Sequence, residues 1–251
     1  MRSRPQALAA ALACAASLAL FAAAPAPRAQ KLAANSAAAS YSALEHEVIR
    51  ELNLARTRPA DYAAHLEEMR ALFSGRELRR PGRVALVTEE GPAALEEAIR
   101  FLRAARPLPP LTLSPGMCSG AKALVEEQSA SGATGHRGAD GSFCEQRASR
   151  FGAWQAPIGE NLSYGDETAR ERVIALIIDD GVANRGHRAR IFNPSNRVVG
   201  VACGSHQMGA MCVLTFAGGF TDRPAAAKPG APRPAARSGR VPKAPAGSKK
   251  F

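Results

Sequence analysis

The chain has 251 residues, 22% of them charged, and a formal net charge of +11 at pH 7. This length fits one domain of ordinary size with terminal extensions. The positive excess lies at the ends, because residues 1–31 carry +4 and residues 221–251 carry +7, which leaves residues 32–220 neutral. A nucleic-acid-binding domain needs a basic surface on its folded part, so we expect no nucleic-acid partner.

Residues 1–30 have the pattern of an export signal. Arg2 and Arg4 precede an apolar run from Ala7 to Ala24, which is rich in Ala and Leu and is followed by small residues. The run is on the short side for a membrane-spanning helix and lacks a basic stop-transfer flank. We therefore expect a cleaved signal peptide and a mature protein that is secreted or periplasmic.

Five helices are predicted between the signal and residue 180. Each starts at a capping residue or a proline that is followed by apolar residues at helical spacing. The expected starts are Ser42 (a capping box with Glu45), Pro59, Pro92, Ser114 and Thr168 (a capping box with Glu171), and the expected ends include Gly75, Gly132 and Asp180. The last helix is apolar on every face between Val173 and Ile178, which predicts burial from several sides.

The strand signals are fewer and lie mostly near the end of the domain. Val198–Cys203 and Met211–Ala217 alternate well enough to form an antiparallel hairpin, with Gly204–Gly209 as its loop. This places His206 in an exposed turn. A short strand is also expected at Val84–Thr88, inside a basic connection that contains proline and glycine.

Four cysteines remain after removal of the signal, and an even number in an exported protein favours two disulfides. Three pairings are possible for Cys118, Cys144, Cys203 and Cys212. We favour Cys203–Cys212, because these residues flank the predicted hairpin, and therefore Cys118–Cys144. A metal cluster is the alternative, but the spacing is irregular and contains no Cys-x-x-Cys pair.

Residues 221–251 are dominated by Pro, Ala, Gly, Lys and Arg, and nearly lack the large apolar residues that a core requires. This composition predicts a disordered tail. A cationic segment of this kind can bind an anionic membrane or envelope polymer. The alternative is a solvated segment with no partner.

Three glycine-flanked phrases combine histidines with carboxylates. They are Gly135-His136-Arg137-Gly138, Gly159-Glu160-Asn161-Leu162, and Asp179-Asp180-Gly181 leading to Gly186-His187-Arg188. The two aspartates lie at a helix C-terminus, where the dipole disfavours negative charge, so a nearby histidine or cation is expected to offset that cost. Two imidazoles with a carboxylate and an open position would suit Zn²⁺.

These phrases, together with Ile191-Phe192-Asn193-Pro194 and Val199-Gly200-Val201-Ala202-Cys203-Gly204, resemble the CAP superfamily of cysteine-rich secretory, antigen 5 and pathogenesis-related proteins. The superfamily includes bacterial SCP-like members. The resemblance covers the chain from Leu44 to Phe220. It implies one α/β domain over residues 40–220, a three-layer α-β-α sandwich.

The resemblance also implies a site. In CAP proteins two histidines and two acids line a central cleft that can bind a divalent metal, often zinc. The matching residues here are His136, Glu160 and His187, with Asp180 as the second acid and Asp179 as its alternative. The family usually has a glutamate at that acid and a tryptophan three residues before it, where this chain has Leu176 or Ile177.

From these observations we expect a monomeric, exported binding module, with or without zinc, that takes a small ligand or a peptide. One alternative is a zinc-dependent hydrolase with Glu160 as general base, although no His-Glu-x-x-His helix is present. Another is an envelope-associated structural protein anchored by its cationic tail. Binding without turnover is the favoured hypothesis.

Overall fold

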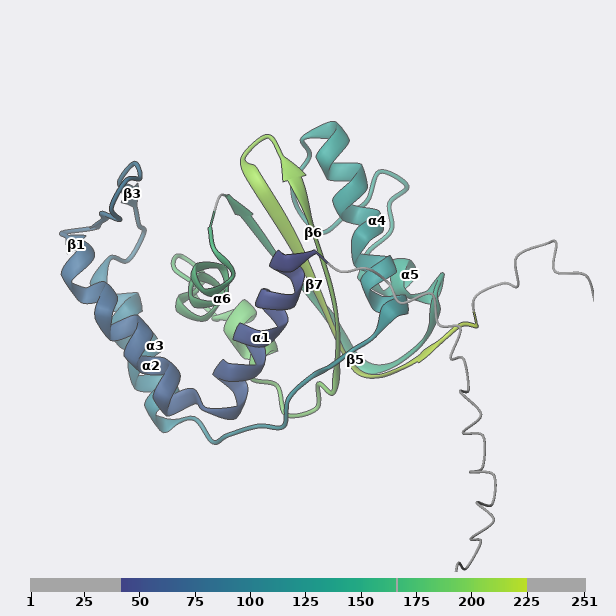
Figure 1. Ribbon diagram of the computed structural model, residues 1–251, viewed down its shortest axis with the longest axis horizontal. Helices are drawn as coiled ribbons and strands as arrows, with labels where there is room; N and C mark the ends of the chain where they lie inside the picture. Colours follow the sequence, from purple (N-terminus) through teal and green to yellow (C-terminus); the bar gives the residue numbers. More distant parts are fainter. Residues whose placement is uncertain (1–41, 166, 225–251) are drawn as a thin grey trace, which may run out of the picture. The chain divides into compact units, whose positions relative to one another are not determined.

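A four-stranded sheet forms the centre of the domain (Figure 1). The computed structural model describes residues 42–165 and 167–224, so the predicted signal peptide and residues 225–251 of the predicted tail lie outside the described residues. The strands are β4 (Thr112–Leu113), β5 (Gly152–Gly165), β6 (Val198–His206) and β7 (Gly209–Asp222). Their order is β4-β6-β7-β5, with β4 parallel to β6 and the other pairs antiparallel.

The predicted C-terminal hairpin is confirmed as β6 and β7, and both strands are longer than expected. Cys203 lies directly opposite Cys212 in the register, and the two form the predicted disulfide. Only Gln207 and Met208 connect the strands. The prediction that His206 lies in an exposed loop is therefore wrong, because this residue is a buried member of β6 whose Nε2 lies 3.0 Å from the carbonyl oxygen of Ala133.

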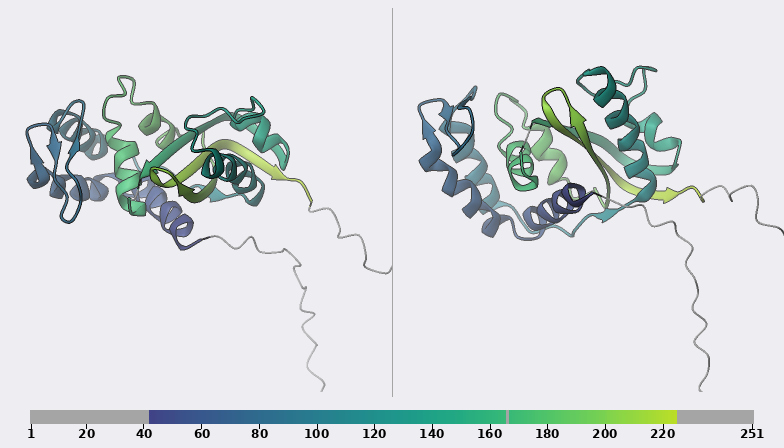
Figure 2. Two further views of the ribbon diagram at one scale, coloured as in Figure 1. Left: turned by 90° about the horizontal axis from the view of Figure 1, so that it is seen from above. Right: turned by 45° about the horizontal axis from the view of Figure 1, so that its top comes forward.

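Helices cover both faces of this sheet, which confirms the three-layer α-β-α sandwich (Figures 1 and 2). On one face lie α4 (Pro115–Ser131) and α5 (Cys144–Ser149). The other face is covered by a larger set: α1 (Ala43–Thr57), α6 (Ala169–Ile178) and α7 (Gly186–Ile191), beside which pack α2 (Pro59–Glu68) and α3 (Pro92–Ala104).

The domain has two hydrophobic cores, because the apolar side chains of β6 and β7 alternate between the two faces of the sheet. Val199 and Val201 point into the larger core with the helices α1, α6 and α7. Ala202 and Val213 point the opposite way and pack on Leu124 of α4. Successive side chains of a strand face opposite sides, so one hairpin supplies apolar surface to both helical layers.

The predicted helix starts agree with the local chemistry, but α2 ends at Glu68, well before the expected Gly75. Ser42 and Thr168 both form complete capping boxes with the glutamate three residues later, and Ser114 caps α4. Gly132 ends α4 in the left-handed conformation. The helix α6 ends two residues earlier than predicted, because Asp179 adopts the left-handed conformation as its C-cap.

A small antiparallel sheet lies between α2 and α3 in the sequence. It follows the short helix η1 (Met69–Leu72) and consists of β1 (Phe73–Ser74), β2 (Glu77–Leu78) and β3 (Leu86–Val87). The strand expected at Val84–Thr88 corresponds to β3. We call residues 77–87 the β2–β3 hairpin.

No strand was predicted around Glu160. This residue lies within the long strand β5, paired with Thr215 of β7. Pro157 and the glycines obscured the strand pattern, and the register shifts between Gln155 and Ile158. Because β5 is an edge strand, a proline and an irregularity are tolerated there.

One predicted disulfide and one predicted domain boundary also differ from the structure. Cys118 and Cys144 are buried and form no disulfide, so the predicted second bridge is wrong in this structure. Their even number alone suggested a bond that the packing does not make. The tail was expected to start at residue 221, but Thr221 and Asp222 belong to β7, where they pair with Ala153 and Gly152.

Close packing of β6 on α4 gives a first testable prediction. A Cβ on Gly200 would lie 2.3 Å from the backbone carbon of Met117, so Gly200→Ala must push α4 away from the sheet. We expect a loss of about 1–3 kcal/mol or more in the free energy of unfolding, measured by urea denaturation. Gly186→Ala is the control, since its Cβ would meet only the Asn184 side chain, at 3.2 Å. Equal stability of the two variants would contradict this account.

Candidate functional site

The first of two histidine–carboxylate pairs joins His136 to Glu160. The imidazole Nδ1 lies 3.0 Å from Oε1 of Glu160, whose side chain is buried in β5 while that of His136 is 47% exposed. Thr215, opposite Glu160 on β7, brings its hydroxyl within 3.5 Å of Oε2. The carboxylate is therefore internal, and the ring attached to it is open to solvent.

A buried arginine, which the sequence analysis did not identify, neutralises this carboxylate. Arg147 of α5 donates from Nη2 to both oxygens of Glu160, at 2.9 and 2.7 Å, and both side chains are almost completely buried. Its Nη1 donates to the carbonyl oxygens of His136 and Ser142. The signal that could have identified it is general: a buried carboxylate requires a cation nearby.

The second pair joins His187 of α7 to Asp179. The imidazole Nδ1 lies 2.6 Å from Oδ1 of Asp179, and the backbone N–H of His187 donates to Oδ2 at 2.8 Å. Burial raises the pKa of the Asp179 carboxyl, but hydrogen bonding and charge from His187 and backbone N–H groups outweigh it. The pKa of Asp179 therefore lies below its ordinary value, and a histidine offsets the charge at this helix end as expected.

Asp180, the acid favoured from the sequence, lies elsewhere. Its carboxylate accepts hydrogen bonds from the backbone N–H groups of Glu89 and Glu90, at 2.6 and 2.9 Å. The left-handed conformation of Asp179 turns the chain at this point, so the two neighbouring carboxylates bind different groups. The structure pairs His187 with the alternative acid, Asp179.

A polar bridge links the two pairs through β5. Arg190 donates from Nη1 to the carbonyl oxygen of Glu160 and to the side-chain oxygen of Asn161. The Asn161 amide in turn donates to the carbonyl oxygen of His187 at 3.1 Å. The Gly-Glu-Asn-Leu phrase thus contacts both histidine segments, one through its glutamate and the other through its asparagine.

These contacts bear on whether the four predicted residues suit a zinc ion. Both oxygens of Glu160 accept hydrogen bonds from Arg147, whereas those of Asp180 accept them from backbone N–H groups of a different segment. Across residues 42–165 and 167–224, no three His, Cys, Asp or Glu side chains are grouped so as to hold a metal. As arranged, the residues do not fit a zinc site, and zinc binding stays a prediction.

A cavity of about 510 Å³ lies beside α6, bounded by η1 and the small sheet. Apolar side chains supply most of its wall, and they include Met69, Leu72, Phe73, Leu78, Ile174 and Ile178. Asp180 also lines it, but His136, Glu160 and His187 do not. The predicted tetrad and this cavity are therefore separate sites, and Asp180 is the only tetrad residue favoured from the sequence that lines the cavity.

The charged part of the cavity wall is an ion-paired group. Arg80 contacts Glu171 at 3.4 Å and Glu167 at 3.9 Å, and Arg83 contacts Glu171 at 3.1 Å. The Nε of Arg80 is buried and has no hydrogen-bond partner among the described residues. Buried N–H donors are almost always satisfied, so this atom is a candidate donor to a bound molecule.

The comparisons with known proteins address the family. Residues 97–216 match the sequence model of CAP, described as the cysteine-rich secretory protein family. Residues 97–216, just under half of the chain, are therefore similar to a CAP domain. This region contains every histidine and acid of the predicted tetrad, whereas η1 and the β2–β3 hairpin precede residue 97.

Two solved structures resemble this chain. One is an extracellular protein with an SCP domain from Bacillus anthracis strain Ames (17% identity, TM-score 0.36, covering 48% of this chain and 37% of that chain). The other is a cysteine-rich secretory protein from Staphylococcus aureus subsp. aureus Mu50 (15% identity, TM-score 0.33, 55% and 42%). The chain thus spans less than half the length of either protein. A search of curated proteins finds no match. No helix among the described residues is long and apolar enough to cross a bilayer.

The buried ion pair yields a prediction for stability. Arg147→Met removes the cation and leaves the Glu160 carboxylate buried, so we expect a loss of about 3–5 kcal/mol in unfolding free energy. The double variant Arg147→Met/Glu160→Gln should recover part of this loss, because a neutral amide is less costly to bury. Chemical denaturation at pH 7 measures both. A single variant as stable as the wild type would show that the pair is energetically unimportant.

The lowered pKa of Asp179 predicts a pH dependence. Its carboxylate stabilises the folded state above the unfolded pKa of about 3.9, and this contribution disappears as pH falls through the lower folded pKa. Asp179→Asn keeps the shape and tolerates the left-handed conformation. We expect it to cost about 1–3 kcal/mol at pH 7 and progressively less below about pH 4. A pH-independent difference in unfolding free energy would contradict the assignment.

Proposed function

We propose that the protein is an exported binding module whose ligand enters the cavity beside α6. Its volume of about 510 Å³ lies within the roughly 300–1,000 Å³ typical of small-molecule sites. A mainly apolar wall with a few polar groups is also typical of such sites. This cavity is the observation that carries the proposal, and export follows from the signal pattern at residues 1–30.

The chemistry of the wall indicates the class of ligand. Apolar side chains from η1, β1 and α6 favour a hydrophobic body, such as an aromatic or aliphatic group of a small molecule or peptide. The unsatisfied Nε of Arg80 favours a hydrogen-bond acceptor on the same ligand. Pairing a buried donor that otherwise lacks a partner removes a cost of about 1–3 kcal/mol.

Binding is favoured over hydrolysis because the predicted general base is already engaged. The Glu160 carboxylate is buried, and Arg147 occupies both of its oxygens. A base that activates water must lie within hydrogen-bond reach of it, whereas the Glu160 side chain is 2% exposed. The histidine–carboxylate pairs instead hold the segments of His136 and His187 against β5 and the end of α6, as hydrogen-bonded imidazoles commonly do.

The proposal predicts that the cavity can be blocked from its exposed side. Ala175 lines the cavity and is itself exposed, so Ala175→Trp should fill the entrance without disturbing the core. The probe is 1-anilinonaphthalene-8-sulfonate, an aromatic sulfonate that fluoresces in apolar surroundings. We expect one binding site on the wild-type protein and affinity reduced about tenfold or more in the variant.

Ala64→Trp is the matched control, because Ala64 is an exposed alanine of α2 outside the cavity wall. It should bind the probe as the wild type does. Near-ultraviolet circular dichroism confirms that each variant keeps its tertiary packing. Equal probe affinity in the wild type and a folded Ala175→Trp variant would contradict the proposal.

A further inference from the structure

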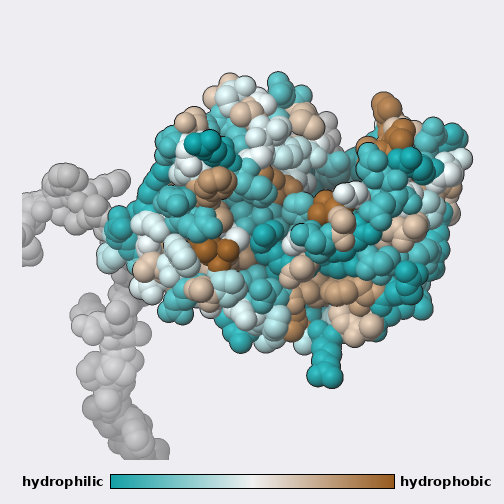
Figure 3. Space-filling model, turned by 180° about the vertical axis from the view of Figure 1, so that it is seen from behind, coloured by the Kyte–Doolittle hydropathy of each residue, from teal (hydrophilic) through white to brown (hydrophobic). Residues whose placement is uncertain are grey.

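The β2–β3 hairpin exposes apolar side chains where a folded domain normally has polar ones, at Val84 in its connection and at Leu86 and Val87 in β3. Val84 is 92% exposed, Leu86 50% and Val87 67%. Only two other large hydrophobic residues in the described part of the chain are comparably exposed, Phe143 and Met208. Hydrophobic atoms also project from this end of the molecule in Figure 3, at the upper right. A clustered apolar patch of this kind marks an interaction surface.

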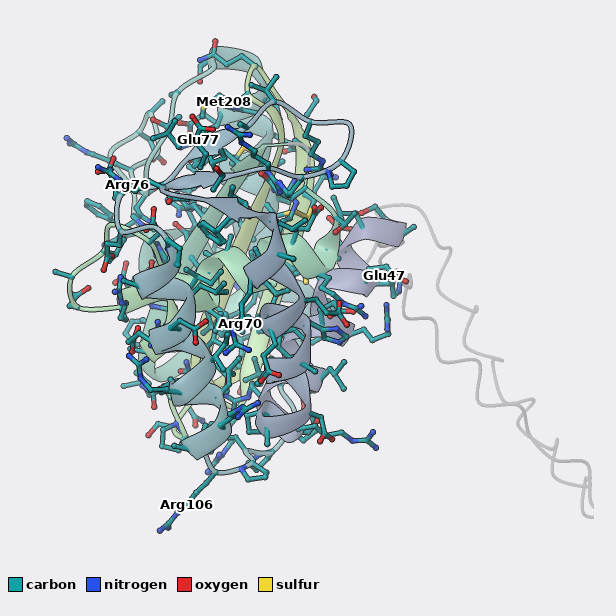
Figure 4. The ribbon with its side chains drawn as sticks, turned by 90° about the vertical axis from the view of Figure 1, so that its left-hand side faces the viewer. Glu47, Arg70, Arg76, Glu77, Arg106 and Met208 are labelled. Atoms are coloured by element: carbon teal, nitrogen blue, oxygen red, sulfur yellow. A yellow bond between two sulfur atoms is a disulfide. The ribbon has the colours of Figure 1, made fainter. Side chains whose placement is uncertain are left out.

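Basic residues lie in the same hairpin. Residues 79–88 contain Arg79, Arg80 and Arg83 and no acid, and of these Arg80 and Arg83 pair with Glu171 in the cavity wall. The nearest acids in the sequence lie at the base of the hairpin, at Glu77, which is opposite Val87, and at Glu89. Arg76 and Glu77 mark that base in Figure 4. Arg79 pairs with Glu77, and both side chains are largely exposed. Exposed pairs of this type contribute little, so the guanidinium can exchange partners.

We propose that the β2–β3 hairpin docks on an anionic lipid surface. The aliphatic side chains would enter the boundary between headgroups and hydrocarbon, while Arg79 and Arg83 would exchange their partners Glu77 and Glu171 for lipid phosphates. A protein partner would have to bury these arginines beside aliphatic groups and supply matching acids. A bilayer offers hydrocarbon and phosphate at successive depths, which matches the arrangement of the hairpin.

A second turn faces the same end of the domain. Met208, 55% exposed, lies in the two-residue connection between β6 and β7. Figures 1 and 4 both place this turn and the hairpin at the upper end of the view. Met208 could thus add a smaller apolar contact when the hairpin meets a surface.

The test uses the full mature protein with vesicles of phosphatidylcholine and phosphatidylglycerol, or of phosphatidylcholine alone, in a flotation assay. The variant is Val84→Ser/Val87→Ser, and neither residue lines the cavity, so the outcome is independent of the proposed ligand site. Phe143→Ser is the control. It removes an exposed apolar residue at the start of α5, which lies at the opposite side of the domain from the hairpin (Figure 1).

The cationic residues 225–251 are present in every protein tested, so binding is also measured at about 0.5 M salt. Attraction by exposed charges is largely screened under that condition, whereas apolar insertion persists. We expect the double variant to bind anionic vesicles about tenfold or more weakly than the wild type at high salt. Phe143→Ser should bind as the wild type does. Arg79→Gln should weaken binding to anionic vesicles at low salt only.

Several results would overturn the proposal. Equal vesicle binding by the wild type and the double variant would show that the hairpin does not dock. No binding of the wild type at high salt would do the same. If the protein instead formed a dimer that Val84→Ser/Val87→Ser dissolved, without vesicle binding, the hairpin would be a self-association surface and not a lipid one. Thermal unfolding checks that all three variants are folded, and substitutions at exposed sites should leave it unchanged.

Discussion

The buried ion pair between Arg147 and Glu160 is the interaction on which the polar centre of this domain depends. It joins α5 to the edge strand β5, and the same guanidinium also holds the loop at His136 and Ser142 through their carbonyl oxygens. One side chain thereby positions the first histidine against the glutamate. The consequence is chemical as well as structural, because both carboxylate oxygens accept hydrogen bonds from a buried guanidinium.

The parts of the fold that could be predicted are those in which a few neighbouring residues determine the backbone. Ser42 with Glu45 and Thr168 with Glu171 encode helix starts by themselves, and Gly132 encodes an end. The β6–β7 hairpin could be predicted because its apolar residues alternate. Each strand buries one face in the larger core and the other face in the smaller core. The order of the layers came from the family resemblance, since no local pattern specifies which helix covers which face.

The parts that could not be predicted depend on contacts between distant residues. The strand β5 carries Pro157 and several glycines, and its conformation is fixed by pairing with β7. Adjacent aspartates cannot be told apart from sequence, but the left-handed C-cap at Asp179 sends one to His187 and the other to the segment after β3. Cysteine parity likewise suggested a bridge that packing does not form. The role of Arg147 could not be predicted from the sequence, because its helix, α5, lacks a clear periodic pattern.

Much of the cavity wall lies outside the residues that match the CAP family. The residues that match the CAP model begin at 97, whereas η1, β1 and the β2–β3 hairpin, which form much of the cavity wall, come before it. Only α6 and the residues at its two ends belong to both, and Asp180 ties the preceding segment to the matched region through two backbone N–H groups. A ligand in this cavity would therefore contact surfaces that the CAP match does not describe. The binding specificity of the cavity would therefore depend on the segment that precedes residue 97, and not on the tetrad alone.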